Sequence, residues 1–197
     1  MKLLYVADGR SPIALNWMRY FIAAGHEVHL ASTFACQALP GLASLEVVTV
    51  ALSEVNAAGA RGRGRLGGLL RTLVPLSLRT AIRQRLGPLT LPHAAERLAQ
   101  IIQHTQPDLV HAMRIPYEGM LAGLALQALP EPRPPLLIST WGNDFTLHAP
   151  STRQMRQATR RAMQAADALH SDCQRDLRLA WEWGFDPQKP AVVLPGG

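Results

Sequence analysis

The sequence predicts a single α/β domain built on a mostly parallel sheet of about seven strands. Short apolar runs, each of strand length, alternate along the chain with segments in which apolar residues recur at helical spacing. Capping residues and glycines mark the ends of several of these helical segments. The length of 197 residues is that of one large domain, so the whole chain is expected to share one core.

Composition excludes several other classes of protein. Apolar residues make up 48% of the chain and charged residues 17%, which is unlike a disordered protein. The chain has two cysteines, Cys36 and Cys173, which are too few for a disulfide-rich scaffold, and no Cys/His spacing indicates zinc. No apolar run approaches the ~18 residues of a membrane span. An apolar start interrupted by Asp8 favours a buried strand over a signal peptide.

The first third of the chain predicts a strand, a helix and two further strands. The helix is expected to begin with Ser11 as its N-cap and Pro12 in its first turn, and to end at Gly25 in a left-handed cap. A turn over residues 8–10 precedes it. The three predicted strands are Lys2–Ala7, Glu27–Ala31 and Leu45–Val50.

An irregular, basic insert follows over residues 57–87. Seven arginines and no acidic residue lie between Glu54 and Glu96, so the formal net charge of +6 comes from this stretch and not from the chain as a whole. Glycines break its first half, and Leu73–Leu86 is predicted to be an amphipathic helix. The leucines and arginines of this insert resemble a segment that binds an anionic membrane surface, although they could equally pack on the domain and face solvent.

Regular alternation then resumes and completes a Rossmann-like order of elements. Pro130 closes one helix and opens a proline-rich surface connection over residues 130–135. Ser151 and Gln154 form a capping-box pattern at the start of another helix, which is expected to end near Ala166. Further helices are predicted over Ala94–His104, Glu118–Leu129 and from residue 171 to Trp183, and strands over Asp108–His111, Leu136–Thr140, Ala168–His170 and Ala191–Leu194.

Polar and glycine-containing loops follow four of the predicted strands. Because ligands of open parallel sheets bind beyond the carboxyl ends of the strands, these loops are expected to converge on one cleft. His111 could bind a sugar hydroxyl or transfer a proton, or be a half-buried ring bonded to a neighbouring carbonyl. Trp141 and the short polar residues after it could form a sugar or nucleoside platform, or a buried indole followed by an Asx turn. Arg114 could pair with a phosphate or be solvated.

Several segments in this order resemble the N-terminal half of family 4 (group 1) glycosyltransferases. They are the opening Lys2–Ala7, the Ala-Gly-His-Glu-Val sequence at residues 24–28, Pro-Asp-Leu-Val-His-Ala at 107–112, Ser-Thr-Trp-Gly-Asn-Asp at 139–144, Ala-Asp-Ala-Leu-His-Ser-Asp at 166–172, and the closing stretch 184–197. Two positions depart from the family pattern. Met113 stands where many members carry the second His of His-x-His, and Trp141 stands where many carry His before Gly.

The resemblance implies one half of a GT-B fold, in which two Rossmann-like domains face each other across a cleft. It implies a retaining, nucleotide-sugar-dependent transfer that needs no metal ion or other cofactor. The N-terminal half would bind the acceptor, and the donor would be held mainly by a C-terminal domain absent from these residues, so the chain alone is expected to be inactive. His111 and Asp144 are the predicted catalytic residues. The predicted substrate-binding residues are Gly9, Arg10, Ser11, Arg114, Tyr117, Trp141, Gly142, Asn143 and Ser171.

Two other functions remain open at this point. One is half of a nucleotide-sugar epimerase-like enzyme. The other is a non-catalytic, basic module that binds a membrane surface or nucleic acid, although the insert lacks the interleaved aromatic residues of a base-stacking surface, so nucleic acid is not the expected partner. The expected partners are a sugar or lipid-linked acceptor and a nucleotide-sugar donor. The expected location is the cytoplasm, with peripheral contact at the inner face of the membrane through the insert.

Overall fold

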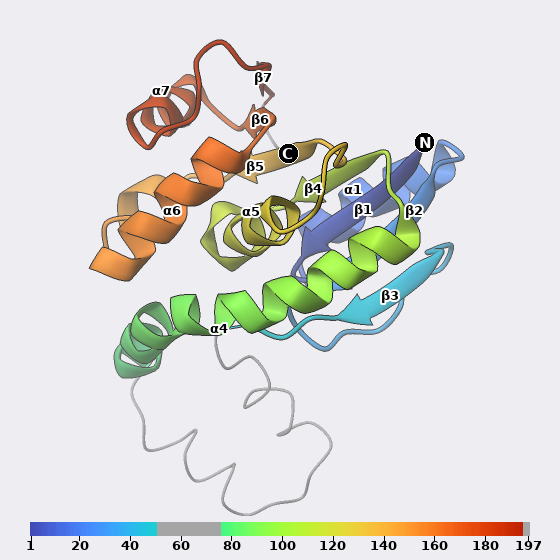
Figure 1. The fold of residues 1–197 in the computed structure, drawn as a ribbon, viewed down its shortest axis with the longest axis horizontal. Coiled ribbons are helices and arrows are strands. Elements are labelled where there is room, and N and C mark those ends of the chain that lie inside the picture. Colours follow the sequence, from blue (N-terminus) through green and yellow to red (C-terminus); the bar gives the residue numbers. More distant parts are fainter. Residues whose placement is uncertain (51–75, 195–197) are drawn as a thin grey trace, which may run out of the picture.

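The structure, a computed structural model, is a seven-stranded, all-parallel sheet with helices on both faces (Figure 1). It describes residues 1–50 and 76–194, and for residues 76–86 it describes the backbone alone. The strand order is β3-β2-β1-β4-β5-β6-β7, and all six neighbouring pairs are parallel. The strands are β1 (Lys2–Ala7), β2 (Glu27–Ser32), β3 (Ser44–Val47), β4 (Leu109–Ala112), β5 (Leu136–Thr140), β6 (Ala168–Ser171) and β7 (Ala191–Val193).

The predicted α/β fold is therefore confirmed, and each predicted strand begins within one residue of its observed start. The helices are α1 (Pro12–Ala23), α4 (Leu76–Thr105), α5 (Met120–Gln127), α6 (Arg153–Ala165) and α7 (Gln174–Glu182), with π-type turns η1 (Ile115–Gly119) and η2 (Asp144–His148). Figure 1 shows α4, α5 and α6 side by side over one face of the sheet. No helix within residues 1–50 and 76–194 combines the length and apolarity needed to cross a bilayer.

Each central strand buries both of its faces, which explains why β1 is apolar from Leu3 to Ala7. Leu4 and Val6 belong to the larger core, which α4, α5, α6 and α7 help to form. Tyr5 points to the opposite face and packs in the smaller core with Met18 of α1. This arrangement is typical of parallel sheets, in which crossover helices cover both faces.

The ends of α1 follow the predicted signals, whereas the start of α6 does not. The Ser11 hydroxyl accepts a hydrogen bond from the Ala14 amide at 3.5 Å, and Gly25 closes α1 with φ of +81°. The predicted cap of α6 was Ser151. In the structure Thr152 is the N-cap, and its hydroxyl accepts from the Met155 amide at 3.1 Å.

The prediction of two separate helices over Leu73–Leu86 and Ala94–His104 was wrong. One helix, α4, runs from Leu76 to Thr105 through Pro88 and Pro92. Each proline removes a backbone donor, but the helix continues because Leu91 and Leu98 are buried in the larger core. Residues 57–75 of the predicted Arg-rich insert lie outside the described residues, and so do the side chains of its residues 76–86.

Candidate functional site at the carboxyl edge of the sheet

The loops that follow β1, β2, β4, β5 and β6 all leave the same edge of the sheet, because every strand runs in the same direction. This edge therefore gathers the four loops that the sequence predicted to share a cleft. The predicted site residues divide into two groups by burial. Gly9, His111, Tyr117, Asp144 and Ser171 are buried, whereas Arg10, Ser11, Arg114, Trp141, Gly142 and Asn143 are partly or fully exposed.

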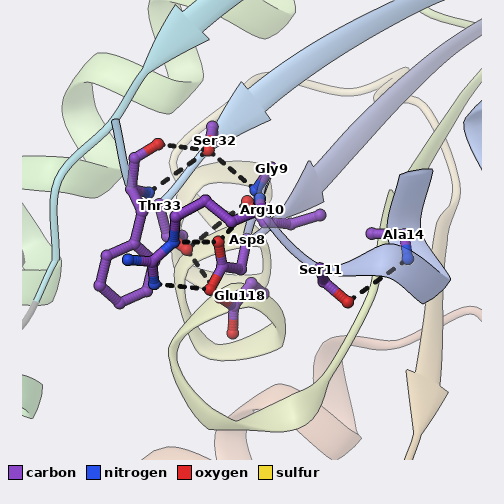
Figure 2. Close-up of polar contacts among 10 residues, drawn as sticks. Asp8, Gly9, Arg10, Ser11, Ala14, Ser32, Thr33 and Glu118 are labelled. Atoms are coloured by element: carbon purple, nitrogen blue, oxygen red, sulfur yellow. Dashed lines mark hydrogen bonds and ion pairs between the residues drawn. The ribbon is translucent and has the colours of Figure 1, made fainter. Parts of the chain in front are cut away.

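Gly9 allows the loop after β1 to pack against the loop after β2. Its amide donates to the Ser32 hydroxyl at 3.0 Å, and a Cβ placed on Gly9 would lie 2.8 Å from that oxygen and collide with the Cys36 sulfur. Figure 2 shows Gly9 directed at Ser32, with Ser11 turned toward Ala14 of α1. Gly9 and Ser11 therefore shape the loop and cap the helix.

Arg10 presents a cation at this edge, held in place by two neighbours. Its Nε and Nη2 atoms donate to the Asp8 carboxylate at 2.9 and 2.8 Å (Figure 2). Its guanidinium carbon lies 3.7 Å from the centre of the Phe34 ring, which is a cation–π contact. The bond to Asp8 raises the pKa of Arg10, so the side chain stays charged.

A buried acid that the sequence reasoning missed lies beside this loop. The Thr33 hydroxyl donates to the Glu118 carboxylate at 2.7 Å, and Glu118 is only 4% exposed (Figure 2). The sequence placed Glu118 at the end of the polar loop that follows the predicted strand Asp108–His111 and at the start of a helix, without a role in the site. The available indication was an acid within an otherwise largely apolar stretch, residues 115–121.

The loop after β4 has an unusual backbone. The predicted helix Glu118–Leu129 is instead the π-type turn η1 followed by the shorter α5. Within η1, the buried residue Tyr117 has φ of +70°, a conformation that side chains rarely adopt. Gly119 lies so close to the chain that an added Cβ would be 2.9 Å from the Arg114 carbonyl oxygen. Such strain is concentrated at functional sites in proteins.

Asp144 joins this loop to the loop after β5. One carboxylate oxygen accepts from Arg114 Nη2 at 3.1 Å and Nε at 3.3 Å, and the other accepts from the amides of Ile115 at 3.1 Å and Trp141 at 3.2 Å. The side chain is fully buried. Burial raises the pKa of the Asp144 carboxyl, while Arg114 and the two amides favour its charged form. Asp144 opens the turn η2, within the segment that follows Trp141.

His111 lies in the interior, beneath α1. Its Nε2 atom is 2.8 Å from the Ser139 hydroxyl, and its ring centre lies 5.1 Å from Tyr5 and 5.3 Å from Trp17. Burial and the neighbouring His170 lower the pKa of His111 to about 3, so the ring is neutral. The alternative interpretation, a half-buried ring bonded to a carbonyl, is therefore corrected in two points, since His111 is only 2% exposed and its partner is a hydroxyl. Its part in catalysis stays a prediction.

Trp141 lines a small pocket at the same edge. The pocket has a volume of about 20 Å³, and its lining residues are Ile13, Trp17, Met113, Ser139, Trp141, His170 and Asp172. The next residues, Gly142 and Asn143, are exposed, and the Gly142 carbonyl accepts from Arg175 at 3.1 Å. The Ser171 hydroxyl is turned inward and donates to the Cys173 carbonyl at 3.0 Å.

In chemical terms, the edge offers the indole of Trp141, exposed amide and backbone groups, and the cations of Arg10 and Arg114. Carbohydrate rings and phosphates are ligands that such groups recognise. Among residues 1–50 and 76–194, no three His, Cys, Asp or Glu side chains are arranged to hold a metal ion.

A parallel α/β domain with its polar groups at the carboxyl edge defines a broad class of ligand-binding domains. Within that class the sequence is specific: residues 9–196 match the Glycosyl transferase 4-like domain, so the chain belongs to that family. The resemblance to family 4 glycosyltransferases is thereby confirmed.

Other comparisons give little further detail. No curated protein matches the chain. Among solved structures, the chain is similar to the spinosyn rhamnosyltransferase SpnG with 16% identity and a TM-score of 0.42, over 90% of this chain and 46% of that one. The chain therefore spans about half the length of that protein.

Proposed function

We propose that this chain is the acceptor-side domain of a retaining glycosyltransferase that uses a nucleotide sugar, within a two-domain GT-B arrangement. The observation that carries the proposal is the family match over residues 9–196. The arrangement of polar groups along the carboxyl edge supports it, since that edge is where open α/β sheets bind ligands. The donor site is proposed to lie in a second domain outside these 197 residues, so the chain alone should bind nucleotide sugars weakly and transfer nothing.

The exposed group of predicted site residues is proposed to contact the acceptor. The Trp141 indole would stack on a sugar ring, and Asn143 would exchange hydrogen bonds with hydroxyls. Gly142, whose Cβ would lie 3.5 Å from Arg175 Nη2, lets the acceptor approach the backbone. Arg10 and Arg114 would attract a phosphate, which suits a lipid-linked acceptor as well as the donor's diphosphate.

The buried group is proposed to hold this surface in place. Asp144 and His111 were the predicted catalytic residues. Asp144 is surrounded by its four donors, and His111 by aromatic rings and Ser139, so contact with a substrate is less favoured than a positioning role. Gly9, Tyr117 and Ser171 are proposed to act in the same way, through the shapes of their loops. No metal ion or other cofactor is part of the proposal.

Contact with an anionic membrane surface through the Arg-rich insert, on a cytoplasmic protein, remains a proposal that rests on sequence. The seven arginines of residues 61–85 are its basis. Binding to anionic vesicles that weakens with salt, and that is lost when Arg71, Arg79, Arg83 and Arg85 become Gln, would support it.

A transfer assay tests the proposed function. The polypeptide that carries this chain in the cell is incubated with a panel of nucleotide sugars and simple glycoside and lipid-phosphate acceptors, and release of the nucleotide is followed. We expect release that depends on an acceptor, and a product with the anomeric configuration of the donor. Conversion of the donor to an isomer without an acceptor would instead support the epimerase alternative, and an inverted anomeric configuration would overturn the retaining mechanism.

A further inference from the structure

A row of hydrogen-bonded side chains crosses the sheet beneath the pocket. His111 Nε2 of β4 lies 2.8 Å from Ser139 Oγ of β5, which lies 3.1 Å from His170 Nδ1 of β6. The three side chains are 2%, 1% and 5% exposed, respectively. His170 also has a hydrogen bond with the backbone of Leu194, just beyond β7. The row therefore crosses three neighbouring strands, β4, β5 and β6, and ends at the residue that follows β7.

The positions of the hydrogen atoms determine which group of the row donates and which accepts in each hydrogen bond. A serine hydroxyl has one hydrogen and can donate to only one of the two imidazoles. The bond with the Leu194 backbone favours a protonated ring, so His170 is its donor. Since Nδ1 faces Ser139, the donating atom is Nε2, and Nδ1 of the neutral ring is then a bare acceptor. Ser139 therefore donates to His170 and accepts from His111 Nε2–H, so that all three bonds run in one direction.

The surroundings keep the row neutral. Burial lowers the pKa of both His111 and His170. Within the described part of the chain, the Asp172 carboxylate favours the charged form of the His170 ring, and His170 in turn lowers the pKa of His111. From α1 it meets the indole of Trp17, which does not titrate and lies 5.2 Å from His170 and 5.3 Å from His111, centre to centre.

We propose that His170 is a positioning residue for the transfer reaction. Its protonation state sets the direction of the hydrogen bonds in this row and the arrangement of the polar groups that line the pocket beside Trp141. The inference rests on the proposed function. A proton added to Nδ1 of His170 removes the acceptor for Ser139. The hydroxyl then accepts from His170 and, because its oxygen has two lone pairs, can accept from His111 as well, so its own hydrogen turns out of the row.

Protonation also changes the pocket itself. Ser139, His170 and Asp172 are its polar lining, and Trp17 and Trp141 also line it. A cationic His170 attracts the Asp172 carboxylate, which is then less able to accept a hydrogen bond from an acceptor hydroxyl. The neutral row is thus the state in which the pocket can take a hydroxyl group.

Nitrogen-15 NMR of the histidine rings in the full chain tests the direction of the row. At pH 7.5 we expect both His111 and His170 to carry their proton on Nε2. In Ser139→Ala the His111 ring should lose this single tautomer, because the acceptor of its Nε2–H is gone, and in Ser139→Thr, which keeps the hydroxyl, it should retain it. Ser44→Ala is the matched control, since it removes the bond of 2.8 Å between Ser44 Oγ and His29 Nδ1 and should alter only the His29 signals. A proton on Nδ1 of His170 at pH 7.5 would overturn the assignment.

The pH profile of transfer tests the positioning role. Loss of the Ser139 donor weakens the neutral form of His170, so Ser139→Ala should move the acidic limb of kcat/KM upward by about one pH unit. Ser139→Thr and Ser44→Ala should leave the limb in place. An unchanged limb in Ser139→Ala would overturn the positioning role. Absence of transfer with every donor would overturn the proposed function and this role with it, while the NMR tautomers would still decide the direction of the row.

Discussion

The Asp144 carboxylate accepts a hydrogen bond of 3.1 Å from the Arg114 guanidinium, across 30 residues of sequence and between the loops that follow β4 and β5. Arg114 is 40% exposed while the Asp144 side chain is fully buried, so the pair connects the surface of the candidate site to its support. Because both loops depend on this carboxylate, its removal should affect the stability of the edge as a whole.

Asp144→Asn is expected to lower the free energy of unfolding by about 2–4 kcal/mol. The amide nitrogen cannot accept a hydrogen bond, so at least one of the four donors loses its partner, and the attraction to Arg114 is lost. Urea unfolding measures the change. Asp8→Asn is the matched control, because the Asp8–Arg10 pair is partly exposed and should contribute no more than about 1 kcal/mol. Equal losses in the two variants would contradict the supporting role of Asp144.

His111 should make the domain sensitive to acid. The pKa of His111 is about 3 in the folded chain, against 6.5 for a histidine of the unfolded chain. Below pH 6.5 the unfolded state therefore binds a proton that the folded state does not. The stabilisation is complete above pH 6.5 and is lost toward pH 3, by up to about 1.4 kcal/mol per pH unit. Urea unfolding at pH 7, 6 and 5 should show a shallower loss in His111→Asn than in the unaltered chain. His93→Gln, at an exposed side chain, should leave the slope unchanged. The same slope in all three proteins would refute the prediction.

Gly9→Ala is expected to cost about 1–3 kcal/mol, because the new methyl group collides with Cys36 and Ser32. Gly142→Ala should stay within about 0.5 kcal/mol, since among the described residues its Cβ meets Arg175 alone, at ordinary contact distance. Thermal unfolding compares the two variants. Adding Cys36→Ala to Gly9→Ala should recover part of the loss, and a Gly9→Ala chain as stable as Gly142→Ala would show that the loop has room to shift.

The sequence was sufficient to predict the sheet, since strand and helix periodicities are local signals. Ser11 and Gly25 marked the ends of α1 because caps act within a few residues. The path of α4 through Pro88 and Pro92 was not predictable in this way. Its continuity depends on the burial of Leu91 and Leu98 against strands elsewhere in the chain.

The candidate site was predicted at the level of loops but not of individual contacts. Parallel strands placed the loops together, as expected from their alternation with helices. The partners of His111, in contrast, come from β1, α1 and β5, and Thr33 meets Glu118 over 85 residues of sequence. Such burial and pairing are tertiary properties, and nothing in the spacing of these residues indicates them.

The most direct test of the acceptor-side assignment is the Michaelis constant for the acceptor in Trp141→Ala, measured in the transfer assay against Trp181→Ala. Trp181 is an indole of α7 that is 42% exposed and belongs to none of the loops of the candidate site, so it controls for the loss of an indole. Thermal unfolding of both variants, and a Trp141→Phe variant that keeps an aromatic face, separate binding from stability. We predict that Trp141→Ala raises the acceptor KM about tenfold, equivalent to about 1.4 kcal/mol of binding, while the donor KM is unchanged and Trp141→Phe recovers most of the loss. An acceptor KM equal to that of Trp181→Ala, or a change confined to the donor KM, would contradict the assignment of this edge to the acceptor.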